Sequence, residues 1–156
     1  MTVIGILQAR TNSERLPGKV LMNILGEPMI IHQLRRLKTC ECLDDIIVAT
    51  SNEKTDDNLA EVCNAAGYRV FRGSLNDVTD RFVQAIKKVP CDHVVRLTAD
   101  CPLTDPKIVD EIVKKHLQCK NDYTCNTLPP TFPDGLDAEI FTITALLNAW
   151  ENAILP

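Results

Sequence analysis

Four apolar runs that alternate with helical patterns constrain the fold more than any other feature of this 156-residue chain. The apolar runs cover 2–7, 45–50, 68–72 and 92–100, and helical patterns cover 28–40, 55–67, 76–89 and 105–119. Strands that alternate with helices form right-handed βαβ units. The sequence therefore predicts an α/β fold of three layers, Rossmann-like, in which helices cover both faces of a mostly parallel sheet.

The pattern changes after residue 120, where 122–127 and 136–142 are predicted as further strands and a final helical pattern runs to the end of the chain. The length fits a single domain over 1–156. Because the chain stops where a helix ends, we expect a further C-terminal segment to be missing. Local signals also predict helix starts: Thr55 or Asp56 as the cap of the second helix, and Asp105 followed by Pro106 at the fourth.

The charge is unevenly distributed. The whole chain carries a formal charge of −4, yet the first 40 residues hold six Lys or Arg and only two Asp or Glu. A small basic patch in an acidic protein favours a small anionic ligand, because nucleic acid requires a wider basic face. No stretch approaches the roughly 20 apolar residues that span a bilayer. Seven cysteines in no disulfide or zinc spacing indicate a reducing compartment, so we expect a cytoplasmic protein without membrane or nucleic-acid partners.

The loop after the first strand reads QARTNSERLPGK and holds Arg10, Arg15 and Lys19. Arginine forks and lysine point charges bind phosphate, and Ser13 with the N–H groups near Gly18 could complete a cradle. The loop matches neither the Walker A pattern nor the G-x-G-x-x-G fingerprint. A solvated surface loop is the alternative, but three cations at a strand end favour phosphate binding.

Asp100 closes the fourth predicted strand, so its carboxylate should point into the same crevice. A carboxylate there can hold Mg²⁺, which prefers oxygen ligands and binds phosphates jointly. The alternatives are a helix cap or a salt bridge to Arg96. Asp100 together with the cationic loop supports a metal–phosphate site.

The loop after the third strand, RGSLNDVTDR, offers a second set of ligand groups. Gly73 would allow a ligand to approach the backbone, and Ser74 could read a base edge. A plain structural account is equally compatible, with Asp77 as a helix cap and Arg81 paired with Asp77 or Asp80.

The segment FPDGLDAE holds Asp134, Asp137 and Glu139. Its Pro-Asp-Gly sequence is a turn signal. The two acidic residues beyond the turn, Asp137 and Glu139, could meet the hydroxyls of a sugar or a metal ion. A solvated strand edge accounts for them better from the sequence alone.

Four segments in order (QARTNSERLPGKVL, FRGSLNDVTDRF, VRLTADCPLTDP and NTLPPTFPDGLDAEIF) closely resemble the cytidylyltransferase-like family of spore-coat polysaccharide biosynthesis protein F. They are similar, more distantly, to the enzymes that make CMP-3-deoxy-manno-octulosonate and CMP-sialic acids. The resemblance covers essentially the whole chain. It implies a nucleotidyltransferase fold and a Mg²⁺-dependent attack of a sugar hydroxyl on the α-phosphate of CTP, which releases pyrophosphate.

The resemblance also implies roles for individual residues. Arg10, Ser13, Arg15 and Lys19 would cradle the triphosphate, and Asp100 would bind Mg²⁺. Gln8 and Ala9, together with Arg72, Gly73 and Ser74, would flank the cytosine. The catalytic set is then Arg10, Lys19 and Asp100, and a homodimer is the implied assembly.

Two other functions fit the same residues. A nucleotide-binding module without catalysis would bind CTP but release no pyrophosphate. A glycosyltransferase that uses a nucleotide sugar would need less positive charge than a triphosphate does, and the cationic loop disfavours it.

Overall fold

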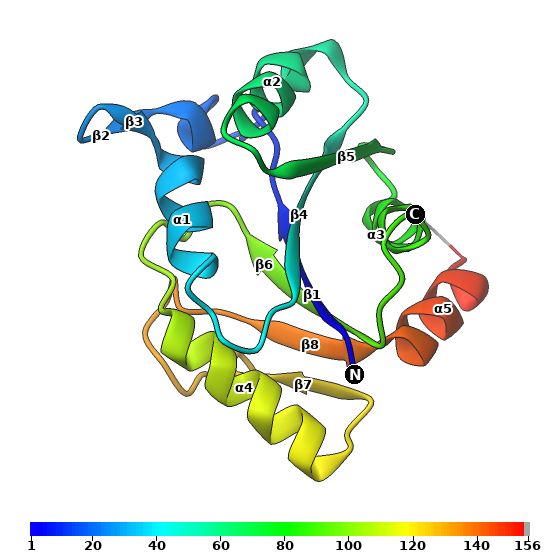
Figure 1. Ribbon diagram of the computed structural model, residues 1–156. Coiled ribbons are helices and arrows are strands. Elements are labelled where there is room, and N and C mark those ends of the chain that lie inside the picture. The colour runs from blue at the N-terminus through cyan, green and yellow to red at the C-terminus, as the bar shows by residue number, and fades with distance from the viewer. Residues whose placement is uncertain (155–156) are drawn as a thin grey trace.

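The computed structural model describes residues 1–154, and within them it has a six-stranded sheet packed between helices (Figure 1). The strands of this sheet are β1 Val3–Gln8, β4 Asp45–Ser51, β5 Arg69–Gly73, β6 His93–Thr98, β7 Tyr123–Cys125 and β8 Glu139–Thr142. The helices are α1 Met29–Leu37, α2 Asp57–Ala65, α3 Val78–Ile86, α4 Pro106–Cys119 and α5 Ile143–Asn152. Short 3₁₀ turns, η1 Lys19–Leu21 and η2 Lys54–Asp56, precede α1 and α2.

The strand order is β5-β4-β1-β6-β8-β7. The first four of these strands are parallel, whereas β8 pairs antiparallel with both β6 and β7. The chain leaves β1 toward β4 and β5, then crosses back to place β6 on the other side of β1. The expected mostly parallel α/β sheet is confirmed, and β1 and β6 flank its topological switch point.

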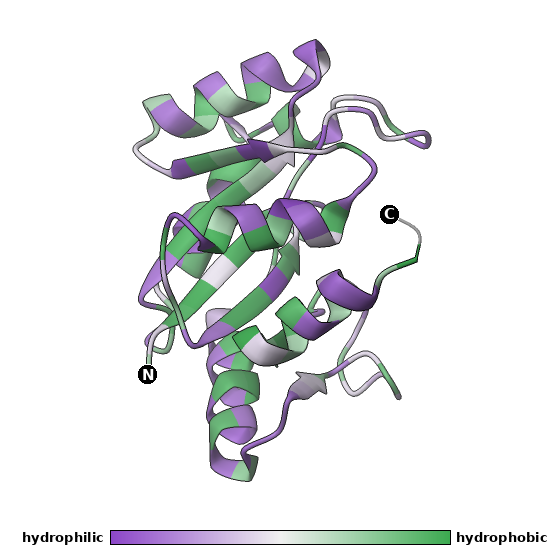
Figure 2. Cartoon of the chain, turned by 90° about the vertical axis from the view of Figure 1, so that its right-hand side faces the viewer, coloured by the Kyte–Doolittle hydropathy of each residue, from purple (hydrophilic) through white to green (hydrophobic). Residues whose placement is uncertain are grey.

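The core lies on both faces of the sheet. Alternate residues of β1 separate into two buried clusters, with Val3 and Leu7 on one face and Ile4 and Ile6 on the other. The first cluster packs against α1, α2 and α4, and the second packs against α3 and α5. Figure 2 shows the hydrophobic strands between helices of mixed hydropathy. Burial on both faces explains why the strands are continuous apolar runs rather than alternating ones.

Local signals fixed some helix starts but not all. The side chain of Asp105 accepts a hydrogen bond from the backbone N–H of Lys107 at 2.9 Å, which confirms the predicted cap of α4. Asp56, rather than Thr55, stands at the N-cap position of α2, but its side chain makes no capping hydrogen bond there, so the predicted capping interaction is wrong. The Asp56 side chain is turned inward and is almost completely buried.

The sequence did not reveal a small hairpin between η1 and α1. Strands β2 Asn23–Ile24 and β3 Glu27–Pro28 pair antiparallel through Leu25 and Gly26, whose φ angles are 50° and 88°. Positive φ at both central positions is what a two-residue hairpin turn requires. Gly26 meets this requirement readily. Leucine rarely adopts a positive φ, so Leu25 gave no turn signal in the sequence. In residues 1–154 the structure holds no helix with the length and apolar character needed to cross a bilayer.

Candidate functional site

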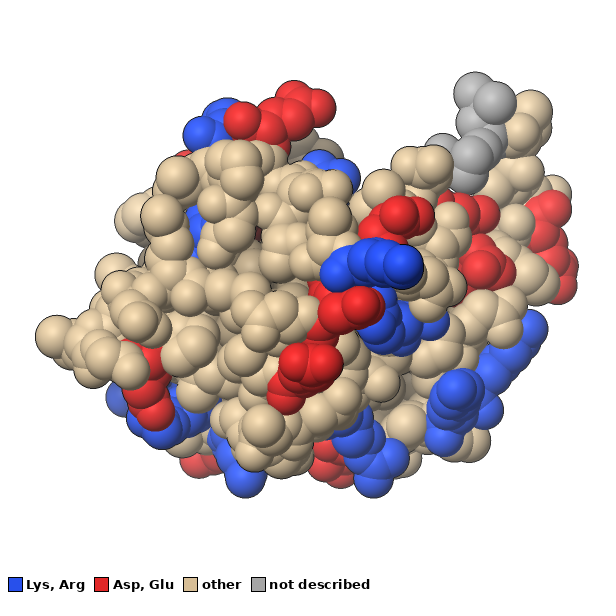
Figure 3. Space-filling model, turned by 90° about the horizontal axis from the view of Figure 1, so that it is seen from above, with Lys and Arg blue, Asp and Glu red and all other residues tan. Residues whose placement is uncertain are grey.

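An open cavity of about 1250 Å³ lies at the carboxyl ends of β1 and β6. Gln8 and Thr98 are directly paired at the ends of these strands, so the loops that follow begin side by side. Three segments line the cavity, within 8–20, 98–103 and 133–137. In parallel α/β sheets, ligands bind in the crevice at this place. Figure 3 views the molecule from above, the side on which β1 ends, and shows basic and acidic side chains next to one another on this face.

Most of the predicted site residues meet in this cavity. Those that line it are Gln8, Ala9, Arg10, Ser13, Arg15, Lys19, Asp100 and Asp137. They come from loops that are distant in the sequence, and the switch point brings them together. Their roles toward a nucleotide or a metal stay predictions, but the structure shows that these side chains line the same cavity.

The cationic loop is closed on the carbonyl oxygen of Thr11. That oxygen accepts hydrogen bonds from the backbone N–H groups of Ser13, at 2.9 Å, and of Gly18, at 2.8 Å. Gly18 has a φ of 72°, a conformation that favours glycine, and the chain then enters η1 at Lys19. The loop therefore returns to its own start, which holds Lys19 near the end of β1.

Lys19 and Asp100 both line the cavity and form an ion pair there. The Nζ of Lys19 lies 2.8 Å from Oδ2 of Asp100, although 81 residues separate them. The hydrogen bond from Lys19 outweighs partial burial and lowers the pKa of Asp100 below its ordinary value. Asp100 is thus an anion at neutral pH. The alternative pairing of Asp100 with Arg96 is wrong.

Helix α1 fixes the loop that carries Asp100. The side-chain amide of Gln33, fully buried, donates from Nε2 to the carbonyl oxygen of Thr98 at 2.9 Å and to Oγ1 of Thr104 at 3.1 Å. Arg36 donates from Nε to the carbonyl oxygen of Thr104. Sequence reasoning missed Gln33, because a single glutamine in an amphipathic helix gives no signal of what it contacts.

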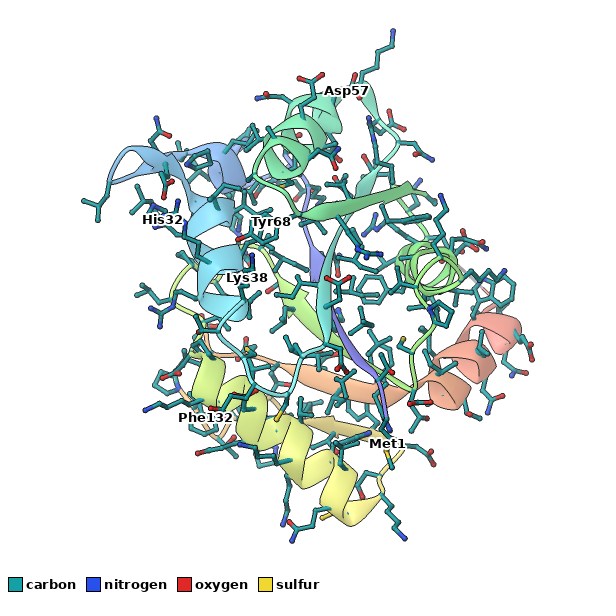
Figure 4. The ribbon with its side chains drawn as sticks, viewed as in Figure 1. Met1, His32, Lys38, Asp57, Tyr68 and Phe132 are labelled. Atoms are coloured by element: carbon teal, nitrogen blue, oxygen red, sulfur yellow. The ribbon has the colours of Figure 1, made fainter. Side chains whose placement is uncertain are left out.

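The predicted base-reading loop does not reach the cavity. The guanidinium of Arg72 donates to the carbonyl oxygens of Ser51 and Glu53 and pairs with Asp57, at 2.7 Å, on the outer end of α2 (Figure 4). Among the described residues that line the cavity, Arg72, Gly73 and Ser74 are absent. Their role toward the base stays a prediction that this geometry does not support.

Gly73 and Ser74 have clear structural roles. A Cβ on Gly73 would lie 3.0 Å from the Arg81 side chain and 3.1 Å from the Phe71 ring, so a larger residue here would have to displace these side chains. The Ser74 hydroxyl accepts from the backbone N–H of Asp77, and Asp77 caps α3 through Asp80. Arg81 is 2% exposed and donates to the Ser74 carbonyl oxygen, so the expected ion pair with Asp77 or Asp80 is wrong.

The two acidic residues after the turn separate. Asp137 lines the cavity together with residues of the cationic loop. Glu139 accepts a hydrogen bond from Nη1 of Arg96 at 2.8 Å across the β6–β8 pair, and it does not line the cavity. Asp137 is therefore better placed than Glu139 to meet a second substrate.

A cationic loop and a carboxylate at the switch point of a parallel sheet define an α/β protein with an anion site suited to a nucleotide. Comparison with known proteins is more specific. The family model described as cytidylyltransferase matches residues 4–154, and the chain belongs to this family.

The similarities to individual proteins agree with the family assignment. The chain is 39% identical over 150 residues to a spore coat polysaccharide biosynthesis protein of Bacillus subtilis, with 94% of this chain and 61% of that protein covered. It is 38% identical over 141 residues to the mitochondrial 3-deoxy-manno-octulosonate cytidylyltransferase of Arabidopsis thaliana, with 86% and 47% covered. A cytidylyltransferase structure from Leptospira borgpetersenii has a TM-score of 0.94 at 38% identity, covering 100% of this chain and 66% of that one. The chain thus spans about three fifths or less of the length of these two curated relatives.

Proposed function

We propose that the chain transfers CMP from CTP to a hydroxyl group of a sugar and releases pyrophosphate. The observation that carries this proposal is the cavity in which the cationic loop faces Asp100. The name of the Bacillus relative supports a sugar of a surface polysaccharide. We also propose that residues 1–156 belong to one nucleotidyltransferase domain and that the assembly is a homodimer, which sedimentation of the chain would test.

The cavity carries the positive charges that would bind the phosphates of a nucleoside triphosphate. Arg10, Arg15 and Lys19 supply three positive charges from one loop that lines the cavity. Arg10 and Arg15 form no ion pair within residues 1–154. Free guanidinium groups can bind phosphate oxygens in a bidentate way. In the proposed complex the backbone of Ala9 and the amide of Gln8 meet the cytosine.

The site also fits Mg²⁺, which the family implies. Mg²⁺ is bound through one or two carboxylates plus substrate phosphates rather than by a full protein cage. Asp100 is an ionised carboxylate at the cavity, and no group of three metal-ligating side chains occurs in the part of the chain that the structure describes. Asp100 would hold the ion, which neutralises charge on the phosphates when bound.

The chain's own residues act by positioning and charge. Lys19 leaves Asp100 and turns to the phosphates when the nucleotide enters, because the two partners then have better ligands. Arg10 and Arg15 hold the triphosphate so that its α-phosphate faces the acceptor hydroxyl near Asp137. Preorganised charges of this kind lower the barrier without a protein nucleophile.

The test is calorimetric titration of the purified chain with CTP, with and without MgCl₂, and with ATP and GTP as controls. The proposal expects selective CTP binding that Mg²⁺ tightens, followed by release of pyrophosphate when candidate sugars are added. Absence of binding for every nucleotide would refute it. CTP binding without pyrophosphate release under any acceptor would instead define a nucleotide-binding module.

A further inference from the structure

A buried carboxylate lies directly beneath the cationic loop. Asp56 is 1% exposed, and both of its oxygens accept hydrogen bonds. Oδ1 accepts from the backbone N–H of Thr11 at 2.8 Å and from the Thr11 hydroxyl at 2.7 Å. Oδ2 accepts from the backbone N–H and the hydroxyl of Ser51, the last residue of β4. One side chain thus joins the end of β4 to the start of the loop after β1.

Thr11 is the residue on which the rest of that loop closes. Its carbonyl oxygen accepts from Ser13 and Gly18, and its hydroxyl also lies 2.9 Å from the carbonyl oxygen of Thr55. Arg10 immediately precedes Thr11, and Lys19 immediately follows Gly18. The positions of both cations therefore depend on where Asp56 holds Thr11.

The electrostatics favour the ionised form of this carboxylate. Burial raises the pKa of Asp56, but the hydrogen bonds from Ser51 and Thr11 together outweigh it and leave the pKa below its ordinary value. Asp56 also stabilises the positive charge of the buried Arg81 side chain. Burial lowers the pKa of Arg81, the field of Asp56 raises it, and the field of Arg10 lowers it. The buried anion thus offsets the repulsion between Arg81, which lies outside the cavity, and Arg10, which lines it.

We propose that Asp56 is the positioning residue of the phosphate-binding loop. It does not line the cavity, and it acts through Thr11 to hold the backbone of the loop that carries Arg10 and Lys19 in place before the nucleotide arrives. A binding loop that is already ordered loses less conformational freedom when its ligand binds. This inference rests on the proposed binding of CTP in the cavity.

The test uses Asp56→Asn, which keeps the shape of the side chain and removes its charge and part of its acceptor capacity. We expect CTP affinity to fall at least about tenfold, because charge-assisted hydrogen bonds to an anion are the strong ones. CMP affinity should fall less, because CMP lacks the phosphates that Lys19 would meet. A variant that was only destabilised, but still folded at the assay temperature, would show no such difference between the two ligands.

Asp110→Asn is the matched control. Asp110 is 6% exposed and accepts hydrogen bonds from the backbone N–H groups of Glu41 and Cys42, at 3.0 and 2.9 Å, but it lies on α4 outside the cavity. Its substitution should lower the melting temperature and leave the ratio of CTP to CMP affinity at the wild-type value. If both variants change that ratio equally, or neither does, the assignment of Asp56 is wrong.

Two threonine variants and one exchange measurement complete the test. Thr11→Val removes the hydroxyl donor and should weaken CTP binding, whereas Thr11→Ser keeps the donor and should bind CTP nearly as well as wild type. If Asp56→Asn does not fold, this pair of variants tests whether Asp56 acts through Thr11. Hydrogen exchange needs no ligand. The Ser13 and Gly18 amides should exchange faster in Thr11→Val than in wild type. Unchanged exchange would overturn the positioning role, whereas altered exchange without any CTP binding by the wild type would refute only the proposed function.

Discussion

Lys19→Met separates the charge of Lys19 from its contribution to the fold. The ion pair with Asp100 is partly solvated, since the two side chains are 23% and 39% exposed. Pairs of this kind contribute about 0.2–1 kcal/mol to the free energy of unfolding. For a chain of this size that corresponds to a shift in melting temperature of at most about 4 °C. The variant should therefore fold almost as well as the wild type.

Its effect on the nucleotide should be much larger. A hydrogen bond from a charged group contributes about 1.5–3 kcal/mol. Each 1.4 kcal/mol is a factor of ten in affinity, so CTP should bind roughly ten- to 150-fold more weakly. CMP, which lacks the β- and γ-phosphates, should lose less than about threefold, well under 1 kcal/mol. Calorimetric titration with both ligands in MgCl₂ measures the two losses.

The control is Lys38→Met, at the exposed end of α1 and outside the cavity (Figure 4). It removes the same charge and should leave both affinities unchanged. Equal losses of CTP and CMP in Lys19→Met would refute the idea that Lys19 meets the outer phosphates. A fall in melting temperature well beyond that of a solvated ion pair would show instead that Lys19 is mainly structural.

Three further predictions concern Asp100 in the cavity, a pair of histidines and the hydrophobic core. Asp100→Asn should abolish the Mg²⁺-dependent tightening of CTP binding while the melting temperature changes little, as titration with and without MgCl₂ would show. Nδ1 of His93 lies 3.1 Å from Nε2 of His116. Burial lowers the pKa of both side chains below the ordinary 6.5. The unfolded chain then takes up protons first, so the free energy of unfolding should fall as the pH drops through about 6.5, and urea titrations of His116→Asn should show a weaker fall. Leu34→Ala, in the core beneath α1, should cost about 2–5 kcal/mol in the same assay.

The local pattern of the chain contained most of the fold. Continuous apolar runs at 2–7 and 45–50 predicted strands buried on both faces, because neighbouring helices leave no solvated side. Asp105 and Pro106 predicted the start of α4, because a cap depends on residues within one turn. The alternation of strands and helices also predicted a ligand crevice at the carboxyl ends of the parallel strands. It did not show which strands flank the switch point, and it included the loop after β5, which does not line the cavity.

The contacts in and around the site were decided by the tertiary structure. Lys19 and Asp100 meet only because β1 and β6 are adjacent, and Glu139 pairs with Arg96 only through the β6–β8 register. The sequence predicted that Thr55 or Asp56 caps α2, but the Asp56 side chain makes no capping hydrogen bond and instead accepts hydrogen bonds from Thr11. A sequence pattern records the burial and spacing of near neighbours. The partner of a polar side chain depends on segments tens of residues away, which only the packed sheet brings within hydrogen-bonding distance.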